Sequence, residues 1–174
     1  MRSSTLRLVV ALVLFTCVFL FMRYYEFDLP VWSYLTGNNA VDPALLHLQG
    51  EFVESHLGTT RELDGSLTLR LIAEQYLFVP HCVLVPAETP IRVRITSADA
   101  VHLLFFAGTT YKLRAVRGTV NEGRFEFPHP GVYSMPCHEF CGAGHYAMRS
   151  RLVAVARDQF PSLKPGEIAS CGPR

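Results

Sequence analysis

Residues 124–156 read RFEFPHPGVYSMPCHEFCGAGHYAMRSRLVAVA, and this stretch carries both a strand pattern and the densest group of metal-binding side chains in the chain. Charged and apolar residues alternate in Arg124–Phe127, as they do in a half-buried strand. Val132–Met135 and Leu152–Ala156 are further short β-rich runs. The segment between these two runs, residues 137–148, is therefore expected to be a loop held between two strands.

The same pattern extends upstream, where short apolar runs are separated by prolines and glycines. The sequence predicts eight strands: Leu67–Ala73, Val83–Val85, Ile91–Thr96, Val101–Phe106, Tyr111–Val116, Arg124–Phe127, Val132–Met135 and Leu152–Ala156. Eight short strands within about ninety residues are typical of a β-sandwich or a Greek-key barrel. We place this mainly β domain at residues 66–160 and a C-terminal tail at residues 161–174.

Length and composition fit one folded domain on a membrane tether. The chain has 174 residues, of which 49% are hydrophobic and 18% charged, and its formal net charge is +1. A disordered chain would be less hydrophobic and more highly charged, and a nucleic-acid-binding domain would have a basic face. We therefore expect no nucleic acid partner. All 15 acidic residues follow Tyr25, whereas Arg2, Arg7 and Arg23 precede it.

The N-terminal region is predicted to be a membrane anchor. An unbroken apolar run covers Leu8–Met22, and with its flanks it can form a helix of roughly 30 Å, the thickness of the bilayer hydrocarbon. A cleaved signal peptide would end in an A-x-A-like site, whereas bulky and charged residues follow here. We predict one transmembrane helix in residues 1–29, in contact with membrane lipid. Arg2 and Arg7 favour a cytoplasmic N-terminus.

A linker with a short helix is predicted for residues 30–65. The helix is expected at about Pro43–Leu57, because Asp42 can cap it and Gly58 suits its C-terminal end. Its apolar face would consist of residues at helical spacing: Leu45, Leu48, Phe52 and His56.

The five cysteines do not form a disulfide framework by their spacing. A compartment outside the cytoplasm would permit a bond between Cys82 and Cys171, but both residues are isolated in the sequence. Cys17 and Cys82 are interpreted as single buried thiols. The remaining two cysteines belong to the loop at residues 137–148.

This loop contains the pattern C-x3-C-x3-H-x2-M in Cys137, Cys141, His145 and Met148. Thiolate, imidazole and thioether ligands together select copper. A mononuclear blue-copper site needs one thiolate fewer, and tetrahedral zinc rarely uses a thioether. The simplest use of both thiolates is to bridge two copper ions. A second imidazole must then come from elsewhere among the seven histidines.

The loop resembles that of subunit II of the haem–copper cytochrome c oxidases, the subunit that carries the dinuclear CuA centre. The family motif C-x-E/Q-x-C-G-x-x-H-x-x-M is matched with Glu139 at its third position. The upstream motif S-x-D-x-x-H is matched by Ser97, Asp99 and His102, and His102 lies 35 positions before Cys137. A lone histidine at the start of an apolar strand is ordinarily a core residue, so His102 becomes a candidate ligand only through this resemblance.

The resemblance implies a set of copper ligands and a fold. The implied ligands are His102, Cys137, Glu139 through its main-chain carbonyl, Cys141, His145 and Met148. The two cysteines would bridge both copper ions, His102 with Met148 would complete one, and His145 with Glu139 the other. A magnesium ion on the Glu139 carboxylate, as in some members, is not expected here. The implied fold is a cupredoxin-like Greek-key β-barrel after one transmembrane helix, as in the shorter B-type oxidases.

The function implied is to accept electrons from cytochrome c or a small copper protein and pass them to haem in subunit I. Oxygen reduction would occur in that partner, in a bacterial inner membrane, with the copper domain on the periplasmic side. Tyr76 or Phe78 is expected either near the path of the incoming electron or packed in the core. Because no acidic run is available, we expect an apolar docking rim: Leu103, Leu104, Phe106, Tyr146 and Ala147.

Three other functions fit parts of the sequence. The CuA subunit of a nitric oxide reductase would have the same ligand loop. A membrane-anchored copper delivery protein would use exposed ligands instead of a loop between strands. A purely structural subunit would have lost the ligands, whereas every ligand position is retained here.

Overall fold

The computed structural model describes residues 3–24, 39–169 and 171, and its contacts divide the chain into two units between Asn38 and Asn39. In the first unit, α1 (Ser3–Tyr24) is helical over 22 residues, and the side chains of residues 5–21 are exposed. No helix within the described residues is long and apolar enough to cross a membrane. Positions 25–29 of the predicted anchor and 30–38 of the predicted linker lie outside the described residues.

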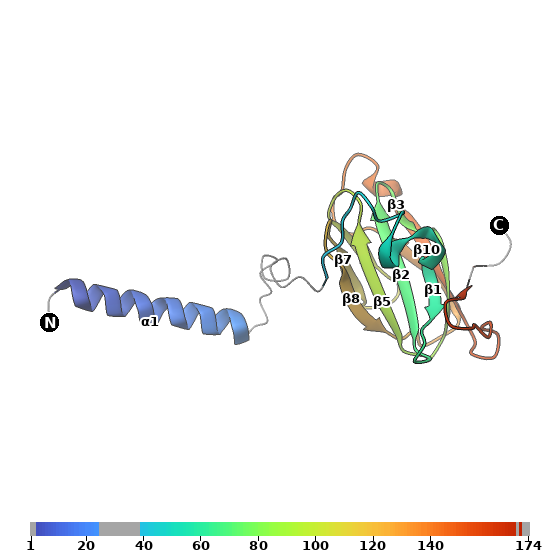
Figure 1. Cartoon of the computed structure of the whole chain (residues 1–174), viewed down its shortest axis with the longest axis horizontal. Helices are drawn as coiled ribbons and strands as arrows, with labels where there is room; N and C mark the ends of the chain where they lie inside the picture. Colours follow the sequence, from blue (N-terminus) through green and yellow to red (C-terminus); the bar gives the residue numbers. More distant parts are fainter. Residues whose placement is uncertain (1–2, 25–38, 170, 172–174) are drawn as a thin grey trace. The chain divides into compact units, whose positions relative to one another are not determined.

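The second unit is mainly β, and its larger sheet has six strands (Figure 1). The strand order is β11–β1–β2–β5–β8, with β3 paired to the end of β2. The bounds are β1 (Gly58–Arg61), β2 (Leu67–Glu74), β3 (Leu77–Val79), β5 (Ile91–Ser97), β8 (Asn121–Phe125) and β11 (Ile168–Ala169). β2 and β5 pair in parallel. Parallel strands are usually covered on both faces, and β2 accordingly has six buried residues out of eight.

Two smaller sheets complete this unit. One has the order β4–β10–β9, with β4 and β10 parallel, and the other is the antiparallel pair β6–β7. The bounds are β4 (Cys82–Pro86), β6 (His102–Phe105), β7 (Lys112–Ala115), β9 (Gly131–Pro136) and β10 (Arg149–Val155). The described strands form these three sheets and do not close into one barrel. The mainly β prediction is therefore confirmed, and its closed barrel is not found.

All eight predicted strands are present. The largest differences are at β8 and β10, which begin three residues earlier than predicted. The sequence does not predict β1, β3 and β11, which have four, three and two residues. β3 and β11 are too short for alternation to be recognised, and β1, with the sequence GTTR, shows no alternation of apolar and polar residues.

The apolar core of this unit reaches the predicted copper loop. Leu71 from β2 and Leu152 from β10 have no exposed surface, and burying each such side chain contributes about 1.5–3 kcal/mol. Cys137, Cys141 and Met148 belong to the same buried cluster. The sulfur-bearing side chains are therefore part of the core and not of a loose surface loop.

The helix predicted at Pro43–Leu57 is wrong. Asp42 does cap a turn, because its carboxylate accepts a hydrogen bond from Ala44 N–H at 2.9 Å. Turns follow, and then two short 3-10 helices, η1 (Gly50–Phe52) and η2 (Glu54–His56). Gly50 has a φ of 83°, in the left-handed region, so a right-handed helix cannot continue through it.

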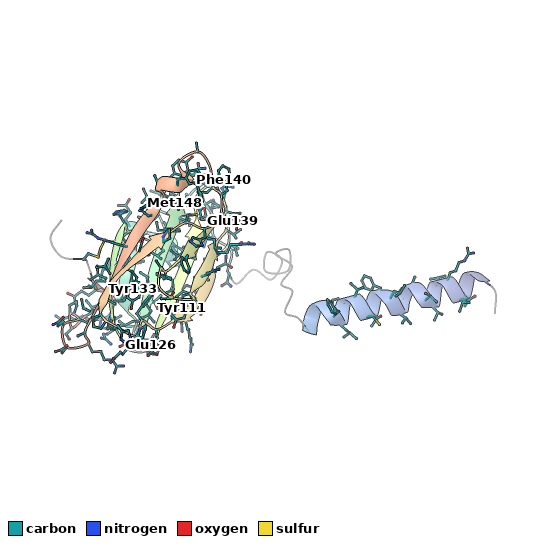
Figure 2. The ribbon with its side chains drawn as sticks, turned by 180° about the vertical axis from the view of Figure 1, so that it is seen from behind. Tyr111, Glu126, Tyr133, Glu139, Phe140 and Met148 are labelled. Carbon is teal, nitrogen blue, oxygen red and sulfur yellow. A yellow bond between two sulfur atoms is a disulfide. The ribbon has the colours of Figure 1, made fainter. Side chains whose placement is uncertain are left out.

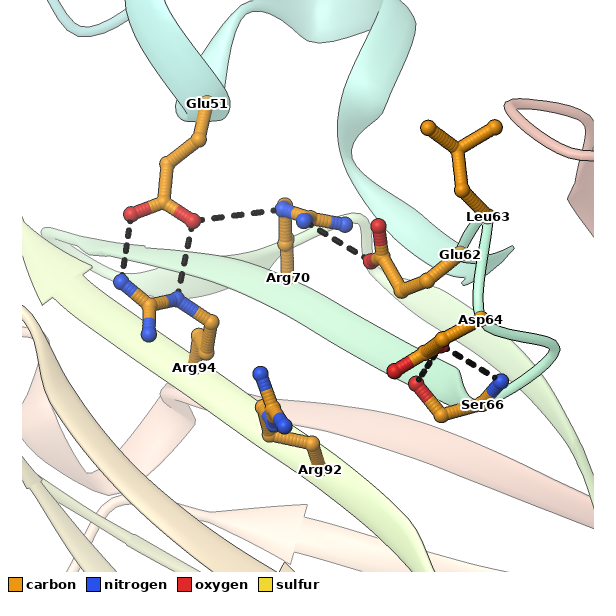
Figure 3. A pocket seen from close by; sticks show the side chains of 8 residues that line it. All are labelled: Glu51, Glu62, Leu63, Asp64, Ser66, Arg70, Arg92 and Arg94. Carbon is orange, nitrogen blue, oxygen red and sulfur yellow. Dashed lines mark hydrogen bonds and ion pairs between the residues drawn. The ribbon is translucent and has the colours of Figure 1, made fainter.

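Glu51 of η1 fastens this segment to the larger sheet (Figure 3). Its carboxylate accepts hydrogen bonds from Arg94 at 2.7 and 2.8 Å and from Arg70 at 3.3 Å. Arg70 also pairs with Glu62 at 2.9 Å. The hydrogen bond to Glu51 raises the pKa of Arg94 above its ordinary value. These residues line a pocket of about 370 Å³, whose arginines and carboxylates pair mainly with each other.

The interpretation of Cys17 and Cys82 as buried thiols is wrong. Cys82 at the start of β4 forms a disulfide with Cys171, with Cα atoms 6.0 Å apart, and Cys17 is exposed. β11 pairs with β1 and so brings the C-terminal segment back along the sheet. The two cysteines are 89 residues apart in sequence, and no local pattern could have shown that they meet.

Replacing both Cys82 and Cys171 with serine is expected to lower the free energy of unfolding by about 2–4 kcal/mol, because the bond closes a long loop in the unfolded chain. Denaturant unfolding of the purified chain measures this change. Cys17→Ser is the matched control and should leave the midpoint unchanged. Equal midpoints for the double variant and the control would contradict the expectation.

Candidate metal centre

His102, the first residue of β6, is fully buried and oriented by Asp99. Its Nε2 lies 2.8 Å from Asp99 Oδ1, so Nε2–H donates and Nδ1 is left as the free imidazole nitrogen. Nδ1 faces Cys137 Sγ at 3.8 Å. A ligating histidine typically has its second ring nitrogen bound to a carboxylate in this way.

The Asp99 carboxylate is itself held in place by several donors. Besides His102, it accepts hydrogen bonds from the backbone N–H groups of Ala100 at 2.5 Å and Gln75 at 2.6 Å. Burial alone would raise the pKa of Asp99, but these hydrogen bonds outweigh it and hold the pKa below its usual range. The group that orients His102 therefore remains an ionised acceptor.

The ligand loop begins at Cys137, directly after β9, and is closed by backbone hydrogen bonds. Cys137 N–H donates to Met148 O at 3.1 Å, which joins the two ends of the loop. His138 N–H donates to Leu103 O at 2.8 Å, which fixes the loop to β6. Because β6 also carries His102, these bonds bring the loop and the upstream histidine together.

Within the loop, the remaining donor atoms surround the two sulfur atoms. Cys141 Sγ lies 3.6 Å from His145 Nδ1 and 3.6 Å from Met148 Sδ. Cys137 Sγ lies 3.2 Å from the carbonyl oxygen of Glu139. His145 belongs to a short 3-10 helix, η3 (His145–Ala147), that turns its ring back toward Cys141.

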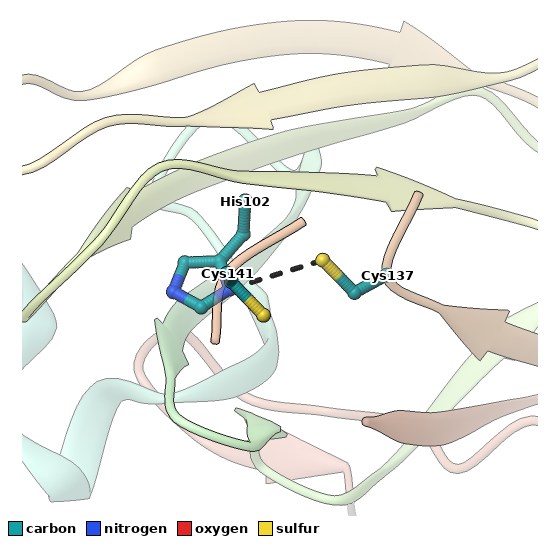
Figure 4. A group of neighbouring side chains, drawn as sticks. All are labelled: His102, Cys137 and Cys141. Carbon is teal, nitrogen blue, oxygen red and sulfur yellow. Dashed lines mark hydrogen bonds between the residues drawn. The ribbon is translucent and has the colours of Figure 1, made fainter. Parts of the chain in front are cut away.

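Figure 4 shows the centre of this group, His102, Cys137 and Cys141, whose ligand atoms all lie within 4.8 Å of one another. All three residues are buried. Burial and the neighbouring Cys137 raise the pKa of the Cys141 thiol to about 11. A thiolate there needs a cation to stabilise it at neutral pH. Two sulfurs and an imidazole are the donors that copper prefers, so the residues present fit a copper site.

The structure brings all six candidate ligands to this end of the β unit. Glu139, Phe140 and Met148 lie together there in Figure 2, far from Tyr111 and Glu126. Two other histidines have different partners: His47 contacts Glu74 at 2.7 Å, and the His138 ring packs against Phe105 in a tilted arrangement.

Phe78 and Tyr76, the two aromatic residues predicted near the path of the incoming electron, contact different parts of the site. Phe78 is fully buried, with its ring 6.5 Å from the His102 ring in an edge-on arrangement. Tyr76 is half-buried against the ligand loop, where its ring occupies the space that a Cβ at Gly144 would need. Phe78 therefore packs in the core, and Tyr76 is a contact of the loop itself.

Gln75, which precedes Tyr76 in the turn between β2 and β3, also contacts the loop and was not predicted from the sequence. Its side-chain Nε2–H donates to the carbonyl oxygen of Cys141. Gly142 lies against the same amide and has a φ of 136°, so glycine is required there for both space and conformation. No sequence signal marks Gln75, because only the fold places this turn beside the loop.

The predicted docking rim needs correction. Leu104 and Phe106 have no exposed surface and belong to the core. Tyr146 is 83% exposed as predicted, and Phe140, which was not predicted, is 74% exposed. The Glu139 carboxylate pairs with Arg114 of β7 at 3.4 Å. The outer surface of the loop therefore includes two exposed aromatic side chains beside an ion pair, together with Ala147, which is exposed as predicted.

This mainly β domain has a candidate soft-metal site with buried thiol and imidazole donors, and comparisons give its family. The family model of the cytochrome c oxidase subunit II periplasmic domain matches residues 54–155, more than half of the chain. The chain therefore belongs to the cytochrome c oxidase subunit II family of the haem–copper oxidases.

Individual relatives agree with this family. The chain is 27% identical over 113 residues to cytochrome c oxidase subunit 2 of Thermus thermophilus, covering 65% of this chain and 84% of the relative. It is 33% identical over 108 residues to the Metridium senile protein of the same name, covering 62% and 41% of the two chains. It is also similar to a chain of a heme-copper terminal oxidase dimer solved by cryo-electron microscopy, with a TM-score of 0.51 and 26% identity. That match covers 88% of this chain and all of the other chain.

Gly144→Ala is expected to disturb the ligand loop. The new Cβ would lie 2.6–2.7 Å from Cε2 and Cγ of Tyr76, although the Gly144 φ of −89° is open to any residue. Overpacking of this kind costs about 1–3 kcal/mol. Thermal unfolding and metal titration should therefore show lower stability and weaker binding than for Ala143→Ser, an exposed control in the same loop.

The double variant Gly144→Ala/Tyr76→Ala tests the cause of this loss. Removing the ring makes room for the new Cβ, so metal affinity should recover toward that of Tyr76→Ala alone. An equal loss with and without the ring would contradict the steric explanation.

Proposed function

We propose that this chain accepts electrons for a respiratory haem–copper oxidase, receiving them from cytochrome c or a small copper protein at a dinuclear CuA centre and passing them to haem in subunit I. The observation that carries the proposal is the buried group of His102, Cys137 and Cys141, with an imidazole Nδ1 facing each sulfur. Family membership supplies the partner, a haem-bearing subunit I. Oxygen reduction then belongs to that partner.

In this proposal the two cysteines would hold two copper ions between them, and the remaining donors would complete the two sites. His102 and Met148 would serve one ion, and His145 with the Glu139 carbonyl would serve the other. When bound, the copper pair supplies a one-electron site whose charge is shared between two metals. The copper assignment is supported by the donor set, since both thiols, both imidazoles and the thioether meet in one place.

The chain's own residues would keep this site dry and rigid. Cys137, Cys141 and Met148 are 6%, 6% and 1% exposed, so water has little access to the sulfur atoms. Asp99 fixes one imidazole, and the bond from Cys137 N–H to Met148 O fixes the loop ends. Donor groups that are already in place need not rearrange when the charge of the site changes, which lowers the barrier to electron transfer.

The exposed aromatic rings give a candidate docking surface for the electron donor. Phe140 and Tyr146 flank the loop that holds the copper ligands, and aromatic side chains are enriched at protein interfaces. Tyr76, half-buried against the same loop, is the candidate for the path of the incoming electron, whereas Phe78 lies deeper. We propose that residues 1–29, which extend beyond the described part of the N-terminal unit, are the membrane anchor that holds the domain on the periplasmic side, with the N-terminus in the cytoplasm.

A copper delivery protein is disfavoured because its ligands must be accessible for exchange, whereas His102, Cys137 and Cys141 are buried here. The nitric oxide reductase alternative uses the same site and differs only in the partner. Mass spectrometry of the membrane subunit that copurifies with this chain separates the two. An oxygen-reducing subunit I supports the proposal, and a nitric-oxide-reducing subunit contradicts it.

The dinuclear centre is tested by metal content. The purified, copper-loaded chain is expected to bind two copper ions, and Cys141→Ser should lose the two-copper centre because one bridging thiolate is removed. Elemental analysis with optical and electron paramagnetic resonance spectra measures both. Cys17→Ser is the matched control and should keep two copper ions. Retention of the two-copper spectrum in Cys141→Ser would contradict the bridging assignment.

Met148→Leu is expected to keep two copper ions but to change the reduction potential, since a weak thioether ligand tunes copper instead of holding it. Leucine fills the same buried space, so the fold should be retained. Spectroelectrochemical titration measures the potential. An unchanged potential would show that Met148 is not a ligand.

A further inference from the structure

Gln75 contacts two parts of the site that lie far apart in the sequence, Asp99 beside His102 and the ligand loop at Cys141. Its backbone N–H donates to Asp99 Oδ2 at 2.6 Å, across 24 residues. Its side-chain Nε2–H donates to Cys141 O, across 66 residues. One residue in the turn between β2 and β3 therefore binds the carboxylate that orients His102 and the backbone of a cysteine ligand.

The two contacts act on different ligands. Asp99 accepts from Gln75 through Oδ2 and from His102 through Oδ1, so the backbone contact acts on the imidazole through the carboxylate. The side-chain contact acts on Cys141 directly, because the carbonyl oxygen belongs to the residue that carries the thiol. The side-chain amide lies against Gly142, where an added Cβ would come within 2.7 Å of Gln75 Nε2.

We propose that Gln75 is a positioning residue that sets the placement of Cys141 relative to His102, and so tunes the copper centre. This inference rests on the proposed function for its effect on copper, but the hydrogen bond from Gln75 to Cys141 can be tested without any metal. Without the amide donor, the carbonyl of Cys141 loses its anchor to the sheet. The loop segment at residues 141–144 then opens more often, and the thiol becomes more accessible.

The backbone contact and the side-chain contact can be separated by substitution. Gln75→Ala keeps the N–H that donates to Asp99 and removes only the amide. Gln75→Glu keeps the shape but presents no N–H donor to the Cys141 carbonyl. Gln159→Ala, an exposed glutamine away from the site, is the matched control.

The first measurement uses the full-length, metal-free, reduced chain. We expect iodoacetamide to alkylate Cys141 about fivefold faster in Gln75→Ala and Gln75→Glu than in Gln159→Ala, the change expected from losing one hydrogen bond that holds the segment closed. Peptide mass spectrometry resolves Cys141 from Cys137 and the exposed Cys17. Equal rates in all three variants would overturn the proposal.

The second measurement uses the copper-loaded chain. Gln75→Ala and Gln75→Glu are expected to bind as much copper as Gln159→Ala but to show a shifted reduction potential and an altered electron paramagnetic resonance spectrum, which a residue that only stabilises the fold would not change. An unchanged potential and spectrum would overturn the inference. If the wild-type chain fails to bind two copper ions, the proposed function fails instead, while the alkylation rates still test the hydrogen bond.

Circular dichroism during heating shows whether each Gln75 variant is folded under the conditions of these measurements. If Gln75→Ala or Gln75→Glu melts at a lower temperature than Gln159→Ala, Gln75→Met replaces it in both measurements. Methionine keeps the length of the side chain but has no hydrogen-bond donor. If the folded Gln75→Met chain had the alkylation rate and the reduction potential of the wild type, the proposal would be overturned as well.

Discussion

Cys137 donates its backbone N–H to Met148 O at 3.1 Å, and this bond closes the loop on which the site depends. The adjacent bond from His138 N–H to Leu103 O ties the closed loop to the strand that begins at His102. Ordering a free loop of this length would cost roughly 1–2 kcal/mol per residue in backbone entropy. The strands and these two backbone hydrogen bonds meet that cost, so the fold itself orders the loop that carries the candidate ligands.

Burial of this loop couples the metal to the state of the thiols. Desolvation and the neighbouring Cys137 raise the pKa of Cys141 to about 11, so a neutral thiol is favoured when no cation is present. A metal ion must therefore displace protons when it binds, and it gains two thiolates in an apolar environment. The same burial that makes the bare thiolate unfavourable makes the metal-bound form stable.

The sequence predicts features that are local and fails where distant segments meet. Cys137, Cys141, His145 and Met148 fall within one loop, so their spacing alone indicates a soft-metal site. The long alternating and apolar runs likewise predict the main strands. His102 needed a family resemblance, because one histidine before an apolar strand is ordinarily a core residue.

The features that sequence could not give depend on tertiary placement. The disulfide of Cys82 requires β11 to return along β1, and Gln75 reaches the loop only because β2 ends beside it. The segment at residues 43–57 has helical apolar spacing, but Gly50 adopts a left-handed conformation and Glu51 is drawn to Arg94. Contacts with the sheet override local helix propensity there.

X-ray absorption spectroscopy at the copper edge of the purified, copper-loaded chain tests the dinuclear assignment most directly. The proposed dinuclear centre predicts sulfur and nitrogen ligands around each copper together with a second copper at short distance, because both cysteine sulfurs would be shared. Sulfur and nitrogen scattering with no copper neighbour would show a single-metal site and would contradict the account.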